Sequence, residues 1–536
     1  MVMSALLVFS LAAQVQGEQT LLFSQPTEKV GSEFFLGDLD GDGRSDLGLM
    51  WWDATYVLHL DGVLAANQRR IPLSVNLPTT FLEFSVIGDA DGDGIRDLVF
   101  GNANGLNGAG ELFLHSGRTG ALLQYIAGIP YRGLGKAVAP AGDIDGDGFA
   151  DFLAAEEDRF FPYGNDLYAF SGRTGAILHL VHTPHIYYAG TPETELGTVG
   201  DIDGDGQDDF FYAISRIATG GQVNIFSGAT GLALANLQGP MQGRYFGQNV
   251  AAAGDINQDG YGDFLVAATE AGFEPMFLEN GEVYVYSGRT LQRLWTFEGE
   301  LSFQHIGTSL LGGKDFDGDG IPDIAYSASL KDTSGVHHWT GIRIRSGRSG
   351  KEITTLNEDG SLFGGGSLQP VAEDLNGDGR PDILVNGTPP FSTWPFDYFL
   401  YAVGFRPRLE LRTPTLSAAA GGSVSFRIDF PAAQAGEHYR LLGSRSGIGP
   451  TLLGGIQVPL TPGDRLWNSS LHGALPYATG TSGQLGPQGG AQASLTFPPG
   501  AAAPLLGTTL YFAVVTAASP PLASQVSSVV ELDILP

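Results

Sequence analysis

One nine-residue pattern, D-x-[DN]-x-D-G-x-x-D, constrains the fold of this chain more than any other feature. It occurs seven times, beginning at residues 38, 89, 143, 201, 255, 315 and 374, so that successive copies start 51, 54, 58, 54, 60 and 59 residues apart. A short apolar, β-compatible segment follows each copy, as in 264–268. Repeats of this spacing predict an array of similar units, each with room for about four strands.

The spacing of oxygen atoms in the pattern suits calcium. Ca²⁺ takes about 6–8 oxygen ligands, and a tightly curled loop offers it the carboxylates of positions 1, 3, 5 and 9 and the backbone carbonyl of position 7. Glycine at position 6 permits the sharp turn. An EF-hand would need Glu at position 12, where the seven copies have Leu49, Phe100, Ala154, Tyr212, Val266, Tyr326 and Val385. We therefore predict up to seven calcium sites, each between two strands, and exclude EF-hands.

The predicted ligands are the residues at positions 1, 3, 5, 7 and 9 of each copy. Taken copy by copy, they are Asp38, Asp40, Asp42, Arg44 and Asp46; Asp89, Asp91, Asp93, Ile95 and Asp97; Asp143, Asp145, Asp147, Phe149 and Asp151; Asp201, Asp203, Asp205, Gln207 and Asp209; Asp255, Asn257, Asp259, Tyr261 and Asp263; Asp315, Asp317, Asp319, Ile321 and Asp323; and Asp374, Asn376, Asp378, Arg380 and Asp382.

The alternative is a set of acidic turns without metal. Several carboxylates within nine residues repel one another unless a cation neutralises them. The chain has 58 acidic and 28 basic residues and a net charge of −30, which seven Ca²⁺ would reduce to about −16. In the fifth copy, Gln258 replaces the glycine of position 4, so we expect weaker binding there.

A second repeat, Ser-Gly-x-Thr/Ser, lies about 25 residues after the start of most copies, in 112–120, 167–175, 223–231, 283–290 and 342–350. Each instance joins an alternating strand to another apolar strand through a tight turn. The unit is therefore strand, calcium loop, strand, long loop, strand, turn, strand. This is a four-stranded antiparallel meander, so we predict an all-β chain with a seven-bladed β-propeller. We expect 20–25 to supply the missing fourth strand of the last blade.

The seven loops, with preceding segments such as 246–268, resemble FG-GAP repeats over roughly residues 20–406. These repeats form the propeller of integrin α subunits, in which Asp at positions 1, 3, 5 and 9 binds Ca²⁺. The resemblance implies a calcium-binding propeller that acts in adhesion. Only the fifth repeat keeps the Phe-Gly pair, at Phe246 and Gly247. Integrins carry such loops in only some blades, and their legs and transmembrane span are not found here, so mechanotransduction is not implied.

The two ends of the chain differ from the repeats. Residues 1–17 resemble a signal peptide, which predicts a secreted or cell-surface protein. The absence of cysteine excludes disulfides and thiolate metal sites. The propeller is expected over 18–406, followed over 407–536 by a small β-sandwich with alternating segments such as 422–430 and 509–517. That last part resembles modules of secreted planctomycete-like bacterial proteins, and its role stays open between surface attachment and a cap.

The charge of −30 disfavours nucleic acid and anionic membranes as partners. We expect a monomer that binds an unknown protein or carbohydrate on the face opposite the calcium loops, where aromatic and histidine residues collect in the longer connections. These candidates are Phe160, Phe161, Tyr163, Tyr187, Tyr188, His337, His338, Trp339, Trp394 and Phe396. The alternative is that they pack within or between blades.

Catalysis is the rival hypothesis, in the form of a polysaccharide lyase or hydrolase on a calcium-stabilised propeller. The sequence has no nucleophile elbow and no HExxH motif. His179, His182 and His185 are the best candidates for chemistry, but strand alternation places His179 and His182 on opposite sides. We therefore expect a binding protein without enzymatic activity. A purely structural role in a cell coat is the third possibility.

Overall fold

The protein was studied as a computed structural model, which describes residues 15–16, 19–26, 30–39, 41, 43–51, 56–60, 68–72, 83–156, 166–182, 194–215, 220–239, 245–270, 280–300, 304–331, 337–357, 366–375, 380–387, 399–405, 408–411, 415–430, 434–449, 451–518, 523, 525–527 and 529–536. The chain divides into two compact units. One is formed by Leu21–Lys314 and Pro322–Gly404. The other is formed by Phe405–Pro536, with the short segments Val15–Thr20 and Asp315–Ile321 assigned to it.

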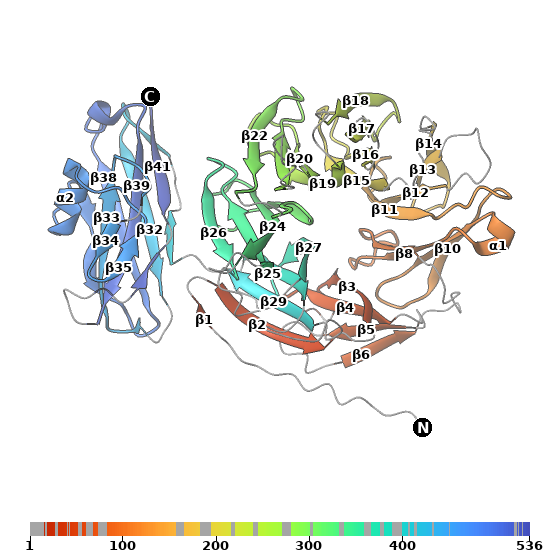
Figure 1. Ribbon diagram of the computed structural model, residues 1–536, viewed down its shortest axis with the longest axis horizontal. Coiled ribbons are helices and arrows are strands. Elements are labelled where there is room, and N and C mark those ends of the chain that lie inside the picture. Colours follow the sequence, from red (N-terminus) through yellow and green to blue (C-terminus); the bar gives the residue numbers. More distant parts are fainter. Residues whose placement is uncertain are drawn as a thin grey trace. The chain divides into compact units, whose positions relative to one another are not determined.

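Among the described residues, the strands of the repeat region form seven antiparallel sheets (Figure 1). Six of them consist of four consecutive strands. These are β3 (Val30–Gly37), β4 (Asp46–Trp51), β5 (Tyr56–Leu60) and β6 (Gln68–Pro72); β7 (Glu83–Val86), β8 (Leu98–Asn102), β9 (Glu111–His115) and β10 (Leu122–Ala127); β11 (Ala137–Gly142), β12 (Asp151–Ala155), β13 (Asp166–Phe170) and β14 (Ile177–His182); β15 (Thr194–Gly200), β16 (Asp209–Ile214), β17 (Gln222–Phe226) and β18 (Ala233–Gln238); β19 (Phe246–Gly254), β20 (Asp263–Ala268), β21 (Glu282–Tyr286) and β22 (Arg293–Glu298); and β23 (Leu310–Lys314), β24 (Asp323–Lys331), β25 (His337–Arg345) and β26 (Glu352–Leu356).

The remaining sheet joins the two ends of the repeat region. It contains β27 (Gly366–Glu373), β28 (Asp382–Gly387) and β29 (Phe399–Phe405), followed by β2 (Gln19–Pro26) and β1 (Val15–Gln16) from the start of the chain. One short helix, α1 (Gly105–Gly108), lies between β8 and β9.

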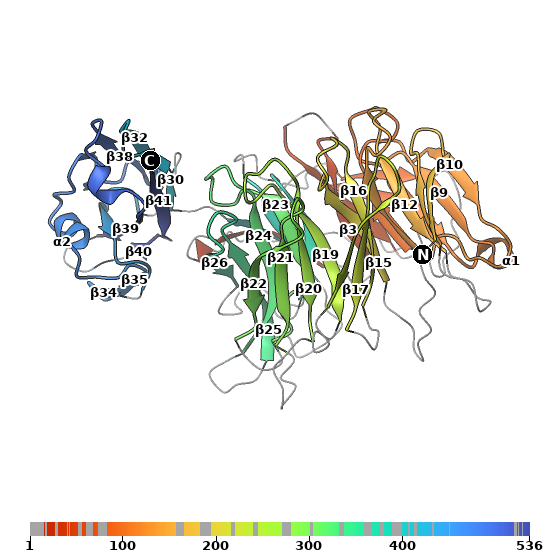
Figure 2. The same ribbon diagram turned by 90° about the horizontal axis from the view of Figure 1, so that it is seen from above.

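The first strands of the seven sheets contact one another in sequence, β3 with β7, β7 with β11 and so on to β27, which contacts β3 again. The sheets of this unit therefore surround a common centre, as Figure 1 shows, and Figure 2 shows their strands side by side from another direction. The prediction of an all-β fold with a β-propeller is confirmed.

The sequence explains why the central strands of these sheets are deeply buried. β8, β12, β16 and β20 are buried at every residue, as continuous apolar runs must be when sheets cover both faces. Aromatic pairs support this packing, with ring centroids 5.4 Å apart for Phe152 and Phe170 and also for Phe264 and Tyr286. These buried strands thus hold the loops that connect the first strand of each sheet to the second.

The second unit contains two sheets that share one hydrophobic core. Phe426 and Phe512, one from each sheet, are both buried, with ring centroids 5.0 Å apart. The first sheet contains β30 (Leu409–Leu411), β32 (Gly422–Asp429), β38 (Gly490–Phe497) and β36 (Ala478–Thr479). The second contains β31 (Thr415–Ser417), β41 (Val530–Leu535), β39 (Thr509–Ala517), β33 (His438–Ser444) and β37 (Ser482–Gln484), and β40 (Gln525–Val526) pairs with β39. A hairpin of β34 (Thr451–Leu453) and β35 (Ile456–Val458), the helix α2 (Arg465–Leu471) and the 3₁₀ turn η2 (Ala503–Leu505) complete this unit.

Most of the predicted ligand-binding residues lie outside the described residues. This is true of Phe160, Phe161, Tyr163, Tyr187, Tyr188, Trp394 and Phe396. For His337, His338 and Trp339 the structure describes the backbone, in β25, but not the side chains. Most of the predicted signal peptide also lies outside. Within the described part of the chain, no helix is both long enough and apolar enough to cross a membrane.

Candidate metal centres

The seven copies of the nine-residue pattern connect the first strand of each sheet to the second, and we call them loops 1 to 7 in chain order. In each fully described loop, two residues with a left-handed backbone conformation produce the tight turn. In loop 2 (89–97) these are Gly92 at position 4, with φ +83°, and Gly94 at position 6, with φ +84°. Residues with a Cβ adopt this conformation at an energetic cost. In loop 5, however, Gln258 adopts it with φ 60°, so the position singled out in the sequence carries backbone strain.

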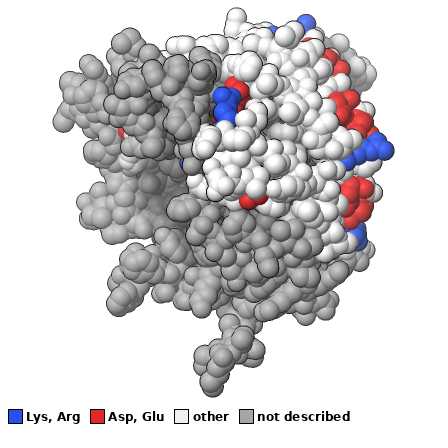
Figure 3. Space-filling model, turned by 90° about the vertical axis from the view of Figure 1, so that its right-hand side faces the viewer, with Lys and Arg blue, Asp and Glu red and all other residues white. Residues whose placement is uncertain are grey.

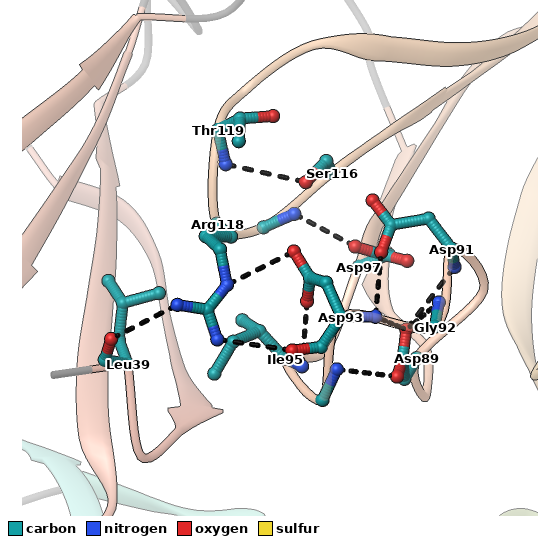
Figure 4. A network of polar contacts seen from close by, with 12 residues as sticks. Leu39, Asp89, Asp91, Gly92, Asp93, Ile95, Asp97, Ser116, Arg118 and Thr119 are labelled. Atoms are coloured by element: carbon teal, nitrogen blue, oxygen red, sulfur yellow. Dashed lines mark hydrogen bonds and ion pairs between the residues drawn. The ribbon is translucent and has the colours of Figure 1, made fainter. Parts of the chain in front are cut away.

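Loop 2 shows how the backbone aims the carboxylates (Figure 4). The Asp89 carboxylate accepts hydrogen bonds from the N–H groups of Gly92 at 2.6 Å and Gly94 at 2.7 Å. The Asp91 carboxylate accepts one from Asp93, and Asp93 accepts one from Ile95 at 2.9 Å. Each carboxylate is thus fixed by the loop's own N–H groups, and the chain winds around the volume that the oxygens surround.

The other described loops repeat this winding. The position 6 N–H donates to the position 1 carboxylate at 2.9 Å in loops 3, 4 and 5 and at 2.8 Å in loop 6. In loop 5, Asn257 replaces the aspartate at position 3 and makes the same contact, because its side-chain oxygen accepts a hydrogen bond from the Asp259 N–H at 2.9 Å. Asp40, Asp42, Asn376 and Asp378, in loops 1 and 7, lie outside the described residues.

The carboxylates of positions 1, 3 and 9 meet in loops 2, 3, 4 and 6. In each of these loops one oxygen from each of the three residues lies within 4.8 Å of the others. These triplets are Asp89, Asp91 and Asp97; Asp143, Asp145 and Asp151; Asp201, Asp203 and Asp209; and Asp315, Asp317 and Asp323. Oxygens bound to one Ca²⁺ at about 2.3–2.6 Å must lie at such separations. The donor set, consisting of hard carboxylate oxygens, also fits calcium.

The aspartate at position 9 connects its loop to the second repeat. Asp97 is fully buried, and its carboxylate accepts from the Ala90 N–H at 2.8 Å and from the Gly117 N–H of the Ser-Gly-Arg-Thr turn at 2.9 Å. The same bond to the turn glycine occurs in four further sheets, at distances from 2.9 to 3.1 Å. The sequence shows both motifs, but it gives no sign that the last aspartate of one anchors the other.

Burial changes the acidity of these aspartates. Removal from water raises the pKa of Asp97, Asp151 and Asp209 to about 7 and that of Asp263 to about 6, although backbone N–H groups that donate to them oppose the rise. A nearby cation favours the ionised form and lowers such a pKa. The loops therefore contain buried acids that are stable as carboxylates at neutral pH when positive charge is supplied to them.

Arginines of the second repeat supply some positive charge, which the sequence analysis did not anticipate. Arg118 Nε lies 3.2 Å from Asp93 Oδ2, and its terminal nitrogens donate to the carbonyls of Asp93 at 3.1 Å and Leu39 at 3.5 Å (Figure 4). Arg173 lies 3.7 Å from Asp147. Its guanidinium group is 4.5 Å from the centre of the Phe149 ring. The recurrence of Ser-Gly-Arg-Thr is the signal that would have pointed to these pairs.

Several neighbouring loops are hydrogen-bonded to one another. The position 8 N–H donates to the position 1 carbonyl of the preceding loop from Ala150 to Asp89 at 2.8 Å and from Gly262 to Asp201 at 2.6 Å, whereas that of Arg96 donates to the Leu36 carbonyl at 3.1 Å. The Ser45 N–H makes the equivalent bond to the Asp374 carbonyl at 3.1 Å, which joins loop 1 to loop 7. Figure 3 shows acidic and basic side chains gathered along one edge of the molecule in that view.

The histidines considered for catalysis have separate partners. His179 Nε2 lies 2.6 Å from the Gly228 carbonyl oxygen, and His182 Nδ1 lies 2.8 Å from an Asp166 carboxylate oxygen. His185 lies outside the described residues. The geometry thus gives His179 and His182 different surroundings, and it does not assemble a shared site from them.

Comparison with known proteins identifies the class of the propeller. Residues 246–286 match the model of the FG-GAP repeat, and residues 315–385 match that of the FG-GAP-like repeat. These matches support an FG-GAP, integrin α-like β-propeller, as the motifs predicted.

Among curated proteins, the chain is similar to integrin alpha pat-2 of Caenorhabditis briggsae, with 32% identity over 231 residues, which cover 36% of this chain and 18% of the relative. It is also similar to integrin alpha-V of Gallus gallus, with 26% identity over 316 residues, which cover 57% of this chain and 25% of the relative. The chain thus spans a quarter or less of the length of these relatives. Among solved structures, the Dos1 propeller matches with a TM-score of 0.41 and 13% identity, covering 70% of this chain and 77% of the other. BamB from Moraxella catarrhalis matches with a TM-score of 0.35 and 14% identity, covering 68% of this chain and 83% of the other.

Proposed function

We propose that this protein is a secreted or cell-surface calcium-binding module whose propeller binds an extracellular ligand. The observation that carries the proposal is the repeated convergence of carboxylates at positions 1, 3 and 9 of the loops, within 4.8 Å of one another. The similarity of the propeller to integrin alpha subunits supports the adhesive role.

Up to seven Ca²⁺ would be held by the residues at positions 1, 3, 5 and 9 and by the backbone carbonyls of position 7. The ion would supply positive charge and fixed coordination. The chain's own contribution is the preformed loop, because N–H groups already orient the carboxylates of positions 1, 3 and 5 in loop 2. The Asp97 carboxylate is hydrogen-bonded to the Gly117 turn, so it would transmit the effect of calcium binding to that turn. Calcium is therefore expected to stabilise whole blades.

The ligand is proposed to be a protein or a carbohydrate, bound by a monomer. The longer connections opposite the calcium loops are the proposed binding face, since loops carried on a rigid scaffold are common binding elements. We propose no catalytic role for His179 and His182, because their ring nitrogens contact a backbone carbonyl and the Arg132-paired Asp166, respectively. Neither arrangement supplies a nucleophile to activate.

Calcium binding is tested on the full chain by isothermal titration and by thermal unfolding, starting from protein freed of metal with a chelating resin. We expect several Ca²⁺ to bind, up to seven, and the unfolding midpoint to rise. At calcium concentrations about 10–100 times Kd, one site contributes roughly 1–3 kcal/mol. The variant Asp91→Ala should lose one ion, whereas Asp429→Ala, in the second unit, should lose none. Full-length folded protein that binds no Ca²⁺ would refute the assignment.

The adhesive role is tested by screening immobilised matrix proteins and glycans with the calcium-loaded chain. We expect saturable binding to at least one of them, and loss of that binding after removal of calcium. Turnover of a polysaccharide during the same screen, seen as new reducing or unsaturated ends, would contradict the proposal and favour the enzyme alternative.

A further inference from the structure

The Ser-Gly-x-Thr turns differ at one position that faces the calcium loops. Arg118 and Arg173 occupy the third residue of the turns paired with loops 2 and 3. In the turn paired with loop 4 this residue is Ala229. The chain therefore contains loops of the same sequence pattern with and without a neighbouring arginine.

We propose that the turn arginines set the calcium affinity of their loops by acting as built-in competing cations. This inference rests on the proposed calcium binding. Arg118 directs Nε to Asp93 Oδ2, the position 5 oxygen that does not accept the Ile95 N–H. In loop 3, Arg173 approaches Asp147 Oδ2 while Oδ1 accepts the Phe149 N–H at 3.0 Å.

Geometry holds the arginines near the loops. The Arg118 guanidinium also donates to two backbone carbonyls, and that of Arg173 lies against the Phe149 ring, an arrangement that attracts a cation to an aromatic face. The turns themselves are fixed, since Gly117 and Gly172 donate to the buried Asp97 and Asp151 carboxylates. A positive charge therefore remains close to the position 5 carboxylate when calcium approaches.

Two effects then weaken calcium binding at these loops. The arginine neutralises part of the negative charge that attracts the ion, and it repels the bound ion across a short distance. The charge of the ligand set is a main determinant of calcium affinity in loops of this kind. Loop 4, with Ala229, is expected to bind calcium more tightly than loop 3.

Reciprocal variants test the inference within single loops. Phe149→Trp and Gln207→Trp place a tryptophan at position 7 of loops 3 and 4, where it can sensitise the luminescence of bound Tb³⁺, and displacement by Ca²⁺ then reports the calcium affinity of that loop. Subtraction of the signal from the chain without the added tryptophan removes the background. Arg173→Gln is added to the first reporter, and Ala229→Arg to the second.

We expect Arg173→Gln to tighten calcium binding at loop 3 by about 3–10-fold, and Ala229→Arg to weaken it at loop 4 by a similar factor. Arg173→Lys keeps the charge and should change calcium binding at loop 3 less than Arg173→Gln does. Arg427→Gln, which removes an arginine of the second unit, should leave both loops unchanged. Unfolding midpoints without metal show that each variant is folded.

The outcomes separate this inference from the proposed function. If neither reporter loop binds Tb³⁺ or Ca²⁺, calcium binding itself is wrong and the inference falls with it. If both loops bind calcium but Arg173→Gln leaves the affinity unchanged or lowers it, the arginine is only a structural contact and the inference is overturned. Should Ala229→Arg fail to fold, the comparison of Arg173→Gln with Arg173→Lys still tests whether the charge of Arg173 weakens calcium binding at loop 3.

Discussion

Removal of calcium should reverse the way in which the stability of this protein depends on pH. Burial raises the pKa of Asp97 from 3.8 to about 7. The unfolded chain releases this proton near pH 4, whereas the metal-free folded chain holds it until about pH 7. The folded state therefore binds more protons in this interval, and its stability falls as pH rises through it.

The magnitude follows from the two pKa values. Between pH 5 and pH 8, the Asp97 carboxyl alone should lower the free energy of unfolding of the metal-free protein by roughly 2–3 kcal/mol. Calcium requires the ionised carboxylate, which only about 1% of folded molecules carry at pH 5. The apparent calcium affinity of loop 2 should therefore be about 100-fold lower at pH 5 than at pH 8. Calcium should stabilise the protein far more at the higher pH.

Urea unfolding of resin-treated protein at pH 5 and pH 8, with and without added Ca²⁺, measures both effects. The variant Asp97→Asn isolates this carboxyl from other titrating groups, since it lacks the buried proton site. Without metal, its loss of stability between the two pH values should be smaller than that of the unmodified chain by roughly 2–3 kcal/mol. Equal losses in the two proteins, or a calcium-induced gain that is the same at both pH values, would refute the reasoning.

Three further substitutions test other parts of the structure. Gln258→Gly should raise stability by about 1 kcal/mol and tighten calcium binding at loop 5, because φ at this residue is 60°; Gln258→Ala should not, and a gain with both would contradict the strain argument. Glu373→Gln should lower the free energy of unfolding by about 0.5–1 kcal/mol, because Glu373 contacts Arg96 and Ser45, and a deficit that persists in 1 M salt would count against an ionic cause. Phe512→Ala should destabilise the second unit by about 3–5 kcal/mol, because its ring is fully buried; in calorimetry the calcium-dependent transition should stay in place, and a joint shift of both transitions would show that the units unfold together.

The elements of the fold that depend on local sequence were predictable. The segment 263–268 is apolar and follows a turn, and it forms β20 with every residue buried. Alternation followed by Ser-Gly-Arg-Thr predicted a strand, a turn and another strand, which are β9 and β10 on either side of Arg118. In both cases the pattern extends over fewer than twenty residues, so that propensity and burial act in the same direction.

The parts of the site that depend on packing between distant residues were not predictable. The bond from Gly117 to Asp97 joins residues 20 positions apart in sequence, and the one from Arg118 to the Leu39 carbonyl joins residues 79 positions apart. The first joins two connections of one sheet and the second joins neighbouring sheets, and periodicity specifies neither. The same is true of the parallel pairing of β31 with β41 in the second unit.

The position of β2 beside β29 has a consequence for the order in which the molecule matures. The chain is synthesised from its N-terminus, so β2 leaves the ribosome long before its neighbour, which ends at Phe405. Contacts between such distant segments form slowly. Until then, β2 and β28 each present an unpaired edge, and such edges are templates for aggregation. A chain truncated before β29 would therefore keep unpaired strand edges permanently and would be prone to aggregation.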